Sequence, residues 1–191
     1  QLCETCGLVQ TVPSLKPEFL DSFYSQHYRP LYTKRIDVDH DALIEEQTAK
    51  GHRFKKYFAE QGLGDGLPNI AIIEIGCSSS VILAALAPSV RSVQGCDLDV
   101  EGIAYGRERY GFDLEVSALP SHLPTSPRLF ILSHVLEHLG DPLQSFRNIR
   151  DLMEEDDYLF VEVPGMNTVG QGNYGYDLWA YFHIAHVSDF T

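Results

Sequence analysis

The sequence is poor in basic residues and has no long hydrophobic run. Its 191 residues include 14 lysines and arginines against 27 aspartates and glutamates, a formal charge of −13. A surface this negative repels phosphate backbones, so nucleic acid is a poor candidate partner. No stretch approaches the roughly 18 uninterrupted apolar residues that span a bilayer, so no membrane association is expected. With 44% apolar residues, the chain is suited to one sizeable globular domain.

Cysteine is also scarce, and the four cysteines do not have the spacing of a disulfide framework. Cys77 and Cys96 follow strand-like apolar runs, which indicates reduced, half-buried thiols and a cytoplasmic setting. Cys3-x-x-Cys6-Gly7 has the form of a zinc-knuckle turn, in which two thiolates converge on one metal. One turn supplies only half of a tetrahedral site. Zinc bound by Cys3 and Cys6, and two cysteines without a metal, therefore both remain open.

The sequence lacks an initiating methionine and a leader with a cleavage site. We expect a chain truncated at both ends. Residues 1–37 would hold the partial knuckle and a tyrosine-rich segment, and residues 38–191 a core without its last strands. The final residues, VSDFT, resemble a helix start capped by Ser188 or Asp189.

Strand-like and helix-like patterns alternate along most of the chain. A helix is expected first, ending at Gly62 and weakened by Gly51 in its interior. Alternation of this kind predicts an α/β fold, with a doubly wound, mostly parallel Rossmann-like sheet and helices on both faces. The predicted strands cover 69–76, 92–99, 112–117, 127–135 and 158–164, and the predicted helices 37–62, 81–89, 100–111 and 141–157.

The residues after the first two predicted strands are candidates for a cofactor site, because doubly wound sheets bind ligands at the carboxyl ends of their strands. The first strand ends in Glu74-Ile-Gly76-Cys-Ser78-Ser-Ser80, and Asp97 follows the second. Asp97 is placed to accept hydrogen bonds from ribose hydroxyls. A nicotinamide dinucleotide would need Gly-x-Gly-x-x-Gly against its pyrophosphate. Two of those glycines are absent, and Glu74 would repel the phosphates.

This segment resembles the class I S-adenosylmethionine-dependent methyltransferases, whose first strand ends in Glu-x-Gly-x-Gly-x-Gly. The resemblance implies that Glu74 faces the positive amino-acid part of the cofactor and that Asp97 holds its ribose. Since that loop carries no phosphate, serine at positions 78 and 80 is acceptable if its backbone dihedrals are negative. SHVLEHLGDP, residues 133–142, is similar to the segment after the fourth strand of many family members.

The similarity spans roughly residues 70–165 and implies a set of cofactor-binding residues. The family usually has acidic residues where Leu129 and Leu119 stand here. The implied set is Glu74, Gly76, Cys77, Ser78, Asp97, Leu98, Ala118, Leu119, Ser133, His134 and Val135.

The knuckle followed by a methyltransferase core is similar to the sugar C-methyltransferases of deoxysugar pathways. That subgroup has Tyr-His-Glu-His in its proposed proton-abstracting site, where this chain has His183-Ile-Ala185-His186. The resemblance makes His186, and secondarily His183, the candidate catalytic base. Ala185 replaces the glutamate, which places carbon methylation in question.

His134, Glu137 and His138 are spaced to share one face of a helical turn. A metal site built from them lacks a further ligand at a known spacing. Hydrogen bonds that shape the turn before Asp141 are the preferred interpretation.

The expected function is methyl transfer from S-adenosylmethionine to a small-molecule acceptor, with a sugar or sugar nucleotide as a candidate and zinc as a possible second cofactor. The alternatives are a non-catalytic relative that keeps the fold as a binding module and, less favoured, a nicotinamide-dependent oxidoreductase. The sequence does not indicate an oligomeric state.

Overall fold

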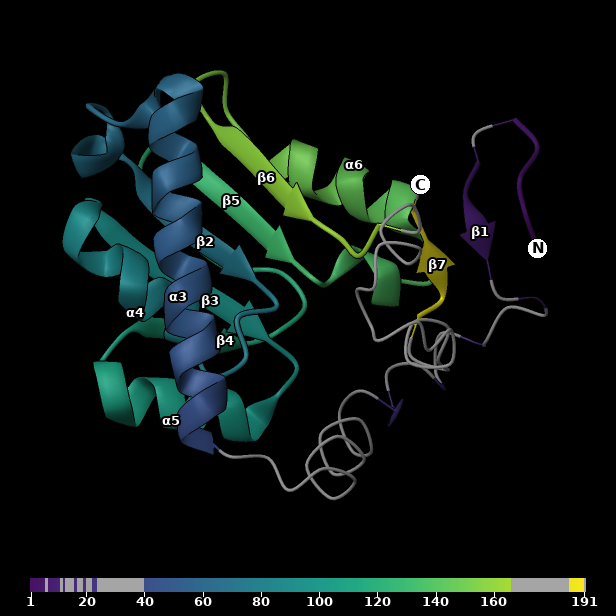
Figure 1. Ribbon diagram of the computed structural model, residues 1–191, viewed down its shortest axis with the longest axis horizontal. Helices are drawn as coiled ribbons and strands as arrows, with labels where there is room; N and C mark the ends of the chain where they lie inside the picture. Colours follow the sequence, from purple (N-terminus) through teal and green to yellow (C-terminus); the bar gives the residue numbers. More distant parts are fainter. Residues whose placement is uncertain are drawn as a thin grey trace. The chain divides into compact units, whose positions relative to one another are not determined.

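The computed structural model describes residues 1–5, 7–10, 12, 16, 19, 22–23, 40–165 and 186–190 (Figure 1). These residues form two compact units. The first unit contains the described residues of Gln1–Phe23, Leu132–Leu152 and Val161–Thr191, and the second those of Tyr24–Ile131 and Met153–Phe160. The boundary predicted at residues 37–38 lies outside the described residues.

A five-stranded sheet in the order β4-β3-β2-β5-β6 confirms the predicted α/β Rossmann-like fold. β3 pairs in parallel with both β2 and β4, and the arrows of β2, β5 and β6 point the same way in Figure 1. The chain runs outward from β2 to β4 and then returns to β5 on the other side of β2. The order therefore reverses beside β2, the place where such sheets bind ligands. The strands are β2 (Ala71–Ile75), β3 (Ser92–Asp97), β4 (Asp113–Val116), β5 (Arg128–Ser133) and β6 (Tyr158–Glu162).

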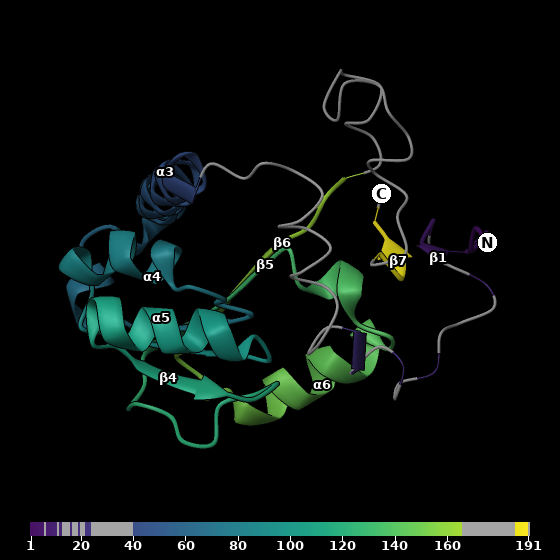
Figure 2. The same cartoon turned by 90° about the horizontal axis from the view of Figure 1, so that it is seen from below.

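Helices flank this sheet, as predicted. Figure 2 shows α3, α4 and α5 on one side of the strands. The helices are α3 (His40–Phe58), α4 (Val81–Leu86), α5 (Val100–Tyr110) and α6 (Pro142–Leu152). Shorter turns are η1 (Ala59–Leu63), η2 (Leu67–Asn69), η3 (Ala87–Ser89) and η4 (Leu136–His138). None of the helices among the described residues combines the length and apolarity needed to cross a bilayer.

The core of the second unit lies between α3, α4 and α5 and the strands that they cover. Ile72 on β2, Ile131 on β5 and Leu83 on α4 are fully buried and belong to one hydrophobic cluster. Phe160 packs edge-on against Phe54, with ring centres 4.8 Å apart. The apolar runs of the sequence thus form one continuous core, as the strand-and-helix pattern predicted.

Gly51, predicted to weaken the first helix, instead permits close packing of α3 on α4. A Cβ on this residue would lie 2.6 Å from Cβ of Ala85 and 3.1 Å from the carbonyl oxygen of Ile82. Real Cβ atoms do not approach so closely, so a residue without a side chain is required here. The helix also ends near the predicted place, since Gly62 has a left-handed φ of 89° within η1.

Local capping residues bound two of the later helices. Gly111 ends α5 in the left-handed conformation, with φ 68°. Asp141 accepts a 2.9 Å hydrogen bond from the backbone N–H of Gln144 and so caps α6. α6 ends at Leu152, earlier than residue 157 as predicted.

The helix start predicted at Ser188 or Asp189 is wrong. These residues form β7 (Ser188–Asp189), which pairs antiparallel with β1 (Val9–Gln10) in the first unit. Ser188 and Asp189 are both buried. Their partner strand lies almost the whole chain length away, and a local capping pattern cannot reveal such a contact.

Candidate functional site

The loop after β2 has the backbone of a glycine-rich loop although it carries serine. Gly76 has φ 78°, Ser78 φ 43° and Ser80 φ 62°. The condition under which serine is acceptable here, negative backbone dihedrals, is therefore not met. A side chain in the left-handed region costs about 1–2 kcal/mol, and functional loops often retain such strain.

Asp97 holds this loop in place from the end of β3. Its Oδ2 accepts a 2.7 Å hydrogen bond from the backbone N–H of Ser78, and its Oδ1 accepts one of 2.8 Å from the N–H of Asp99. The hydroxyl of Ser78 donates to Asp99 at 3.1 Å. The carboxylate predicted to hold a ribose is thus fixed in orientation by backbone groups and adjoins the loop.

Glu74 is almost fully buried near the end of β2, with 2% of its surface exposed. Among the described residues, its Oε2 has no hydrogen-bond partner. Burial, and secondarily the negative charge of Asp97, raises the pKa of Glu74 to about 8, while Lys50 opposes the shift. A buried carboxyl group with an unsatisfied oxygen requires an explanation.

Two glycines on α5 bring that helix against the loop, and the sequence analysis missed them. A Cβ on Gly102 would lie 2.8 Å from the carbonyl carbon of Ser78, and one on Gly106 would lie 3.0 Å from Oγ of Ser80. Their spacing of four residues places them on one helix face, which is the signal that could have identified them.

The remaining loop-side candidates differ in exposure. Cys77 is buried, and a Cβ on Gly95 would lie 2.6 Å from its sulfur. Burial raises the pKa of its thiol far above the usual range, so it is neither a nucleophile nor a metal ligand in this state. Leu98 and Ala118 are exposed and Leu119 is half-buried. These residues do not contribute charge, and their predicted contacts with adenine remain predictions.

Ser133, His134 and Val135 follow at the end of β5 in the first unit. The hydroxyl of Ser133 donates to Oε2 of Glu162 at 2.7 Å, and the N–H of His134 donates to the carbonyl oxygen of Glu162 at 2.9 Å. His134 has a left-handed φ of 56°. Strain at a non-glycine residue that lies after a strand is typical of functional turns.

The turn after His134 places the carboxylate of Glu137 near three histidines. Oε1 of Glu137 lies 3.2 Å from Nδ1 of His134 and 3.9 Å from Nε2 of His138. The backbone N–H of Val187 donates to the carbonyl oxygen of Glu137 at 2.8 Å, which brings His186 to the same turn. The rings of His138 and His186 meet at a centre-to-centre distance of 5.2 Å. The structure thus brings the candidate base His186 to Glu137, a contact the sequence did not predict.

Of the other predicted residues, Cys3 adopts the expected turn. Its N–H donates to the carbonyl oxygen of Leu8 at 2.8 Å, and its carbonyl oxygen accepts from Gly7 at 2.9 Å, with Gly7 at φ 77°. Cys6 and His183 lie outside the described residues. Zinc binding by Cys3 and Cys6 stays a prediction, since a single thiolate among the described residues does not make a site.

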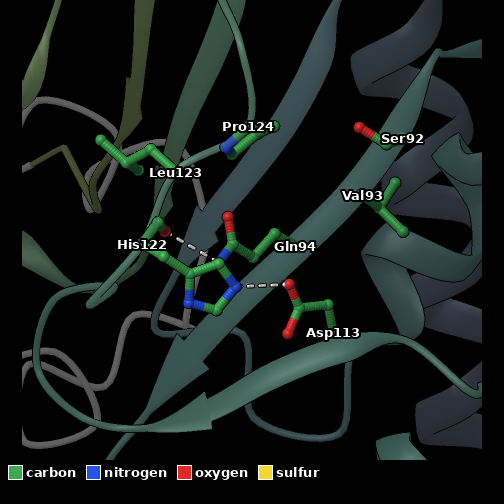
Figure 3. Close-up of a pocket in the computed structure, with 7 residues that line it drawn as sticks. All are labelled: Ser92, Val93, Gln94, Asp113, His122, Leu123 and Pro124. Carbon is green, nitrogen blue, oxygen red and sulfur yellow. Dashed lines mark hydrogen bonds and ion pairs between the residues drawn. The ribbon is translucent and has the colours of Figure 1, made fainter.

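A surface pocket of about 280 Å³ lies near the starts of β3 and β4, and its lining includes none of the predicted site residues (Figure 3). His122 is its central polar group, with Nε2 2.8 Å from Oδ2 of Asp113. The bond to Asp113 raises the pKa of His122. Both side chains are exposed, so this is a solvated ion pair at the opposite end of the strands from Asp97. The lining residues are Ser92, Val93, Gln94, Asp113, His122, Leu123 and Pro124.

Comparison with solved structures supports the fold. The plantazolicin methyltransferase BpumL in complex with SAH is 12% identical with a TM-score of 0.59, over 81% of this chain and 61% of that one. The plantazolicin methyltransferase BamL in complex with a triazolic desmethylPZN analog and SAH is 12% identical with a TM-score of 0.53, over 81% and 59%. An S-adenosylmethionine-dependent methyltransferase from Clostridium acetobutylicum ATCC 824 is 14% identical with a TM-score of 0.50, over 75% and 59%.

This chain therefore spans about three fifths of the length of these neighbours. At such low identity the similarity shows the fold alone. A comparison with curated protein sequences finds no match. The sequence profile described as "Methyltransferase domain", however, matches residues 44–191, most of the chain. Together with a sheet that reverses beside β2 and a loop anchored by Asp97, this match shows that the chain belongs to the methyltransferase domain family.

Proposed function

We propose that this chain binds S-adenosylmethionine at the loop after β2 and transfers its methyl group to a small molecule. The observation that carries the proposal is Glu74, a buried carboxylate with an unsatisfied oxygen, next in space to the loop that Asp97 orients. The residues fit the cofactor. Glu74 provides negative charge for its ammonium group, and Asp97 presents a fixed carboxylate for a pair of ribose hydroxyls.

When bound, the sulfonium of the cofactor supplies an electrophilic methyl group. The residues of this chain have the tasks of orientation and proton removal. Gly76 and Ser78 shape the loop, and the adenine would lie along Leu98, Ala118 and Leu119. Ser133, His134 and Val135 border the methionine part in this proposal. The strain at His134 supports a role for that turn.

His186 is the proposed base that accepts the acceptor's proton, with His183 as the second candidate. Asp189 supports this role, since its Oδ1 lies 3.7 Å from Nδ1 of His186 and would stabilise the imidazolium that forms. We further propose a sugar or sugar nucleotide as the acceptor. This finer choice depends on the resemblance of the knuckle and of residues 183–186 to the sugar C-methyltransferases. Buried thiols at Cys77 and Cys96 are consistent with the proposed cytoplasmic location.

Calorimetry with S-adenosylhomocysteine tests the cofactor site directly. We expect wild type to bind one equivalent and Glu74→Gln to bind about 10–100-fold more weakly, the loss typical of a hydrogen bond to a charged group. Glu101→Gln on the exposed surface of α5 is the matched control and should bind as wild type does. Absence of binding to folded wild type would overturn the proposal.

Binding should also release a proton at neutral pH. The pKa of Glu74 is about 8 before binding, and an ammonium group beside it would lower that pKa, so the carboxyl ionises as the ligand binds. Calorimetry at pH 7 in buffers of different ionisation enthalpy should show proton release in wild type and none from this group in Glu74→Gln. Equal proton release by both proteins would contradict the role of Glu74.

Turnover distinguishes the enzyme from a non-catalytic binding module. Labelled methyl transfer to a panel of sugars and sugar nucleotides should be lost in His186→Asn, with binding of S-adenosylhomocysteine retained. Cofactor binding without transfer to any acceptor would favour the binding module.

A further inference from the structure

The first unit contains three side chains arranged as ligands of one metal ion. Glu137 and His138 come from η4, and His186 comes from the residue pair before β7. One ligand atom from each of the three lies within 4.8 Å of the others. The sequence indicated Glu137 and His138 but no further ligand at a known spacing. In the fold, His186, about fifty residues later in the chain, lies close to both. We infer that Glu137, His138 and His186 bind a divalent transition-metal ion.

The arrangement of the two imidazoles agrees with shared coordination. With a metal–nitrogen bond of about 2.0–2.1 Å, each ring centre lies about 3 Å from the metal, and two rings at a tetrahedral angle lie about 5 Å apart. The observed separation of the rings of His138 and His186 is 5.2 Å, at 60°. The donor atoms would need to approach by about 1 Å to reach tetrahedral spacing, a change that side-chain rotation can supply.

Burial supplies a second, independent observation. The side chain of Glu137 is 2% exposed, and neither carboxylate oxygen accepts a hydrogen bond of good geometry among the described residues. The ion pair with His134 reaches only Oε1, and that histidine is half-exposed. A carboxylate buried in this way requires a cation close by. The cluster itself positions the nitrogens of His138 and His186 where they can hold one.

Asp189 completes the arrangement as a supporting residue. Histidines that ligate a metal through one nitrogen commonly direct the other toward a carboxylate. Oδ1 of Asp189 lies 3.7 Å from Nδ1 of His186 and, among the described residues, has no hydrogen-bond partner. A His₂–carboxylate set of this kind suits Zn²⁺ and other first-row divalent ions. It is distinct from any zinc at Cys3, which offers sulfur.

The inference changes the expected role of His186 whenever metal is present. A nitrogen that ligates a metal cannot accept a proton, so metal occupancy and the base proposed above exclude one another at that nitrogen. Zinc should accordingly inhibit transfer that depends on His186. This consequence rests on the proposed function, whereas the metal site itself does not.

Titration of the full chain with Zn²⁺ and Co²⁺ tests the site without an acceptor. We expect one equivalent of Zn²⁺ whose binding in calorimetry persists in Cys3→Ser, a raised melting temperature, and, in that variant, Co²⁺ d–d absorption without the charge-transfer band of a thiolate ligand. Glu137→Gln, His138→Gln and His186→Asn should each weaken Zn²⁺ binding more than 100-fold, and Asp189→Asn about 10–100-fold.

Two matched variants separate this cluster from other sites. His122→Gln alters an exposed histidine that lies between two carboxylates, and Cys3→Ser removes the thiolate of the knuckle; neither should change this binding. The inference is overturned if wild type does not bind Zn²⁺ or Co²⁺. It is also overturned if the affinity for Zn²⁺ is lost in His122→Gln or Cys3→Ser and retained in the ligand variants. The wild-type spectra and melting shift decide the matter even if a ligand variant fails to fold.

Discussion

Ser80 illustrates how one residue can retain a backbone that its side chain disfavours. It is fully buried at the start of α4 and has φ 62°. Its Oγ occupies the space that the missing side chain of Gly106 leaves open. The loop of a glycine-rich family is thus preserved in conformation by neighbours that leave room for serine.

Replacing Ser80 by glycine should relieve this strain. We expect Ser80→Gly to be about 1 kcal/mol more stable than Ser80→Ala, because both lose the hydroxyl but only alanine keeps a Cβ in the left-handed region. Urea denaturation of the two variants gives the comparison. Equal free energies of unfolding would show that the neighbouring packing, and not φ, determines the stability at this position.

At the scale of whole elements, the predictions based on periodicity were confirmed. All five predicted strands of the sheet and the helices at 81–89, 100–111 and 141–157 are present, with ends shifted by a few residues. Buried parallel strands have short continuous apolar runs, and Gly111 and Asp141 indicate helix ends by local chemistry. Errors arose where an element depends on a distant partner, as β7 does on β1.

The contact between α3 and α4 yields a prediction at this scale. Gly51→Ala should destabilise the protein by about 1–3 kcal/mol through overpacking against Ala85, although alanine favours an isolated helix by about 1 kcal/mol. The free energy of unfolding from denaturant titration measures the change.

Two further variants test the cause. Gly66→Ala is the control, because its added Cβ would meet nothing nearer than 3.5 Å, and it should change stability by less than about 0.5 kcal/mol. Combining Gly51→Ala with Ala85→Gly should restore part of the loss. A stabilising effect of Gly51→Ala alone would contradict the packing argument.

At the scale of the whole molecule, buried carboxyls determine how stability depends on pH. Burial raises the pKa of Asp157, but hydrogen bonds from Arg128, including Nη2 to Oδ2 at 2.6 Å, outweigh it and leave the pKa lowered. Burial raises the pKa of Glu137 too, but interactions with His134 and His138 outweigh it and leave that pKa lowered. Burial raises the pKa of Asp189 to about 6 and that of Glu74 to about 8.

The carboxyls with lowered pKa values and those with raised pKa values affect stability on opposite sides of a pH maximum. Lowered pKa values contribute stability above the unfolded pKa of about 4, which is lost as pH falls through the folded pKa. Carboxyls with raised pKa values contribute stability at low pH. This stability is lost as the pH rises through about 6 for Asp189 and about 8 for Glu74. Ligand-free protein should therefore be most stable near about pH 5, as melting followed by circular dichroism in dilute solution can measure.

Two variants test which residue causes the loss of stability at alkaline pH and which causes the loss at acidic pH. Glu74→Gln should flatten the loss of stability toward alkaline pH. Asp157→Asn should lower stability by about 3–5 kcal/mol at neutral pH, because it removes the buried carboxylate partner of Arg128 and leaves only the exposed Glu154, and should weaken the acid dependence. A wild-type profile that rises steadily from pH 5 to pH 9 would contradict this assignment.

The sequence by itself determined the class of fold, the strand ends that carry Glu74 and Asp97, and the family to which their spacing is similar. These features are local, since periodicity, caps and short motifs are set by neighbouring residues. Only the tertiary structure decided that Ser78 and Ser80 adopt positive φ, that Glu74 is buried with an unsatisfied oxygen, and that His186 meets Glu137 and His138. These three features depend on burial or on contacts between segments far apart in the chain. Burial and distant contacts cannot be calculated from a local sequence pattern.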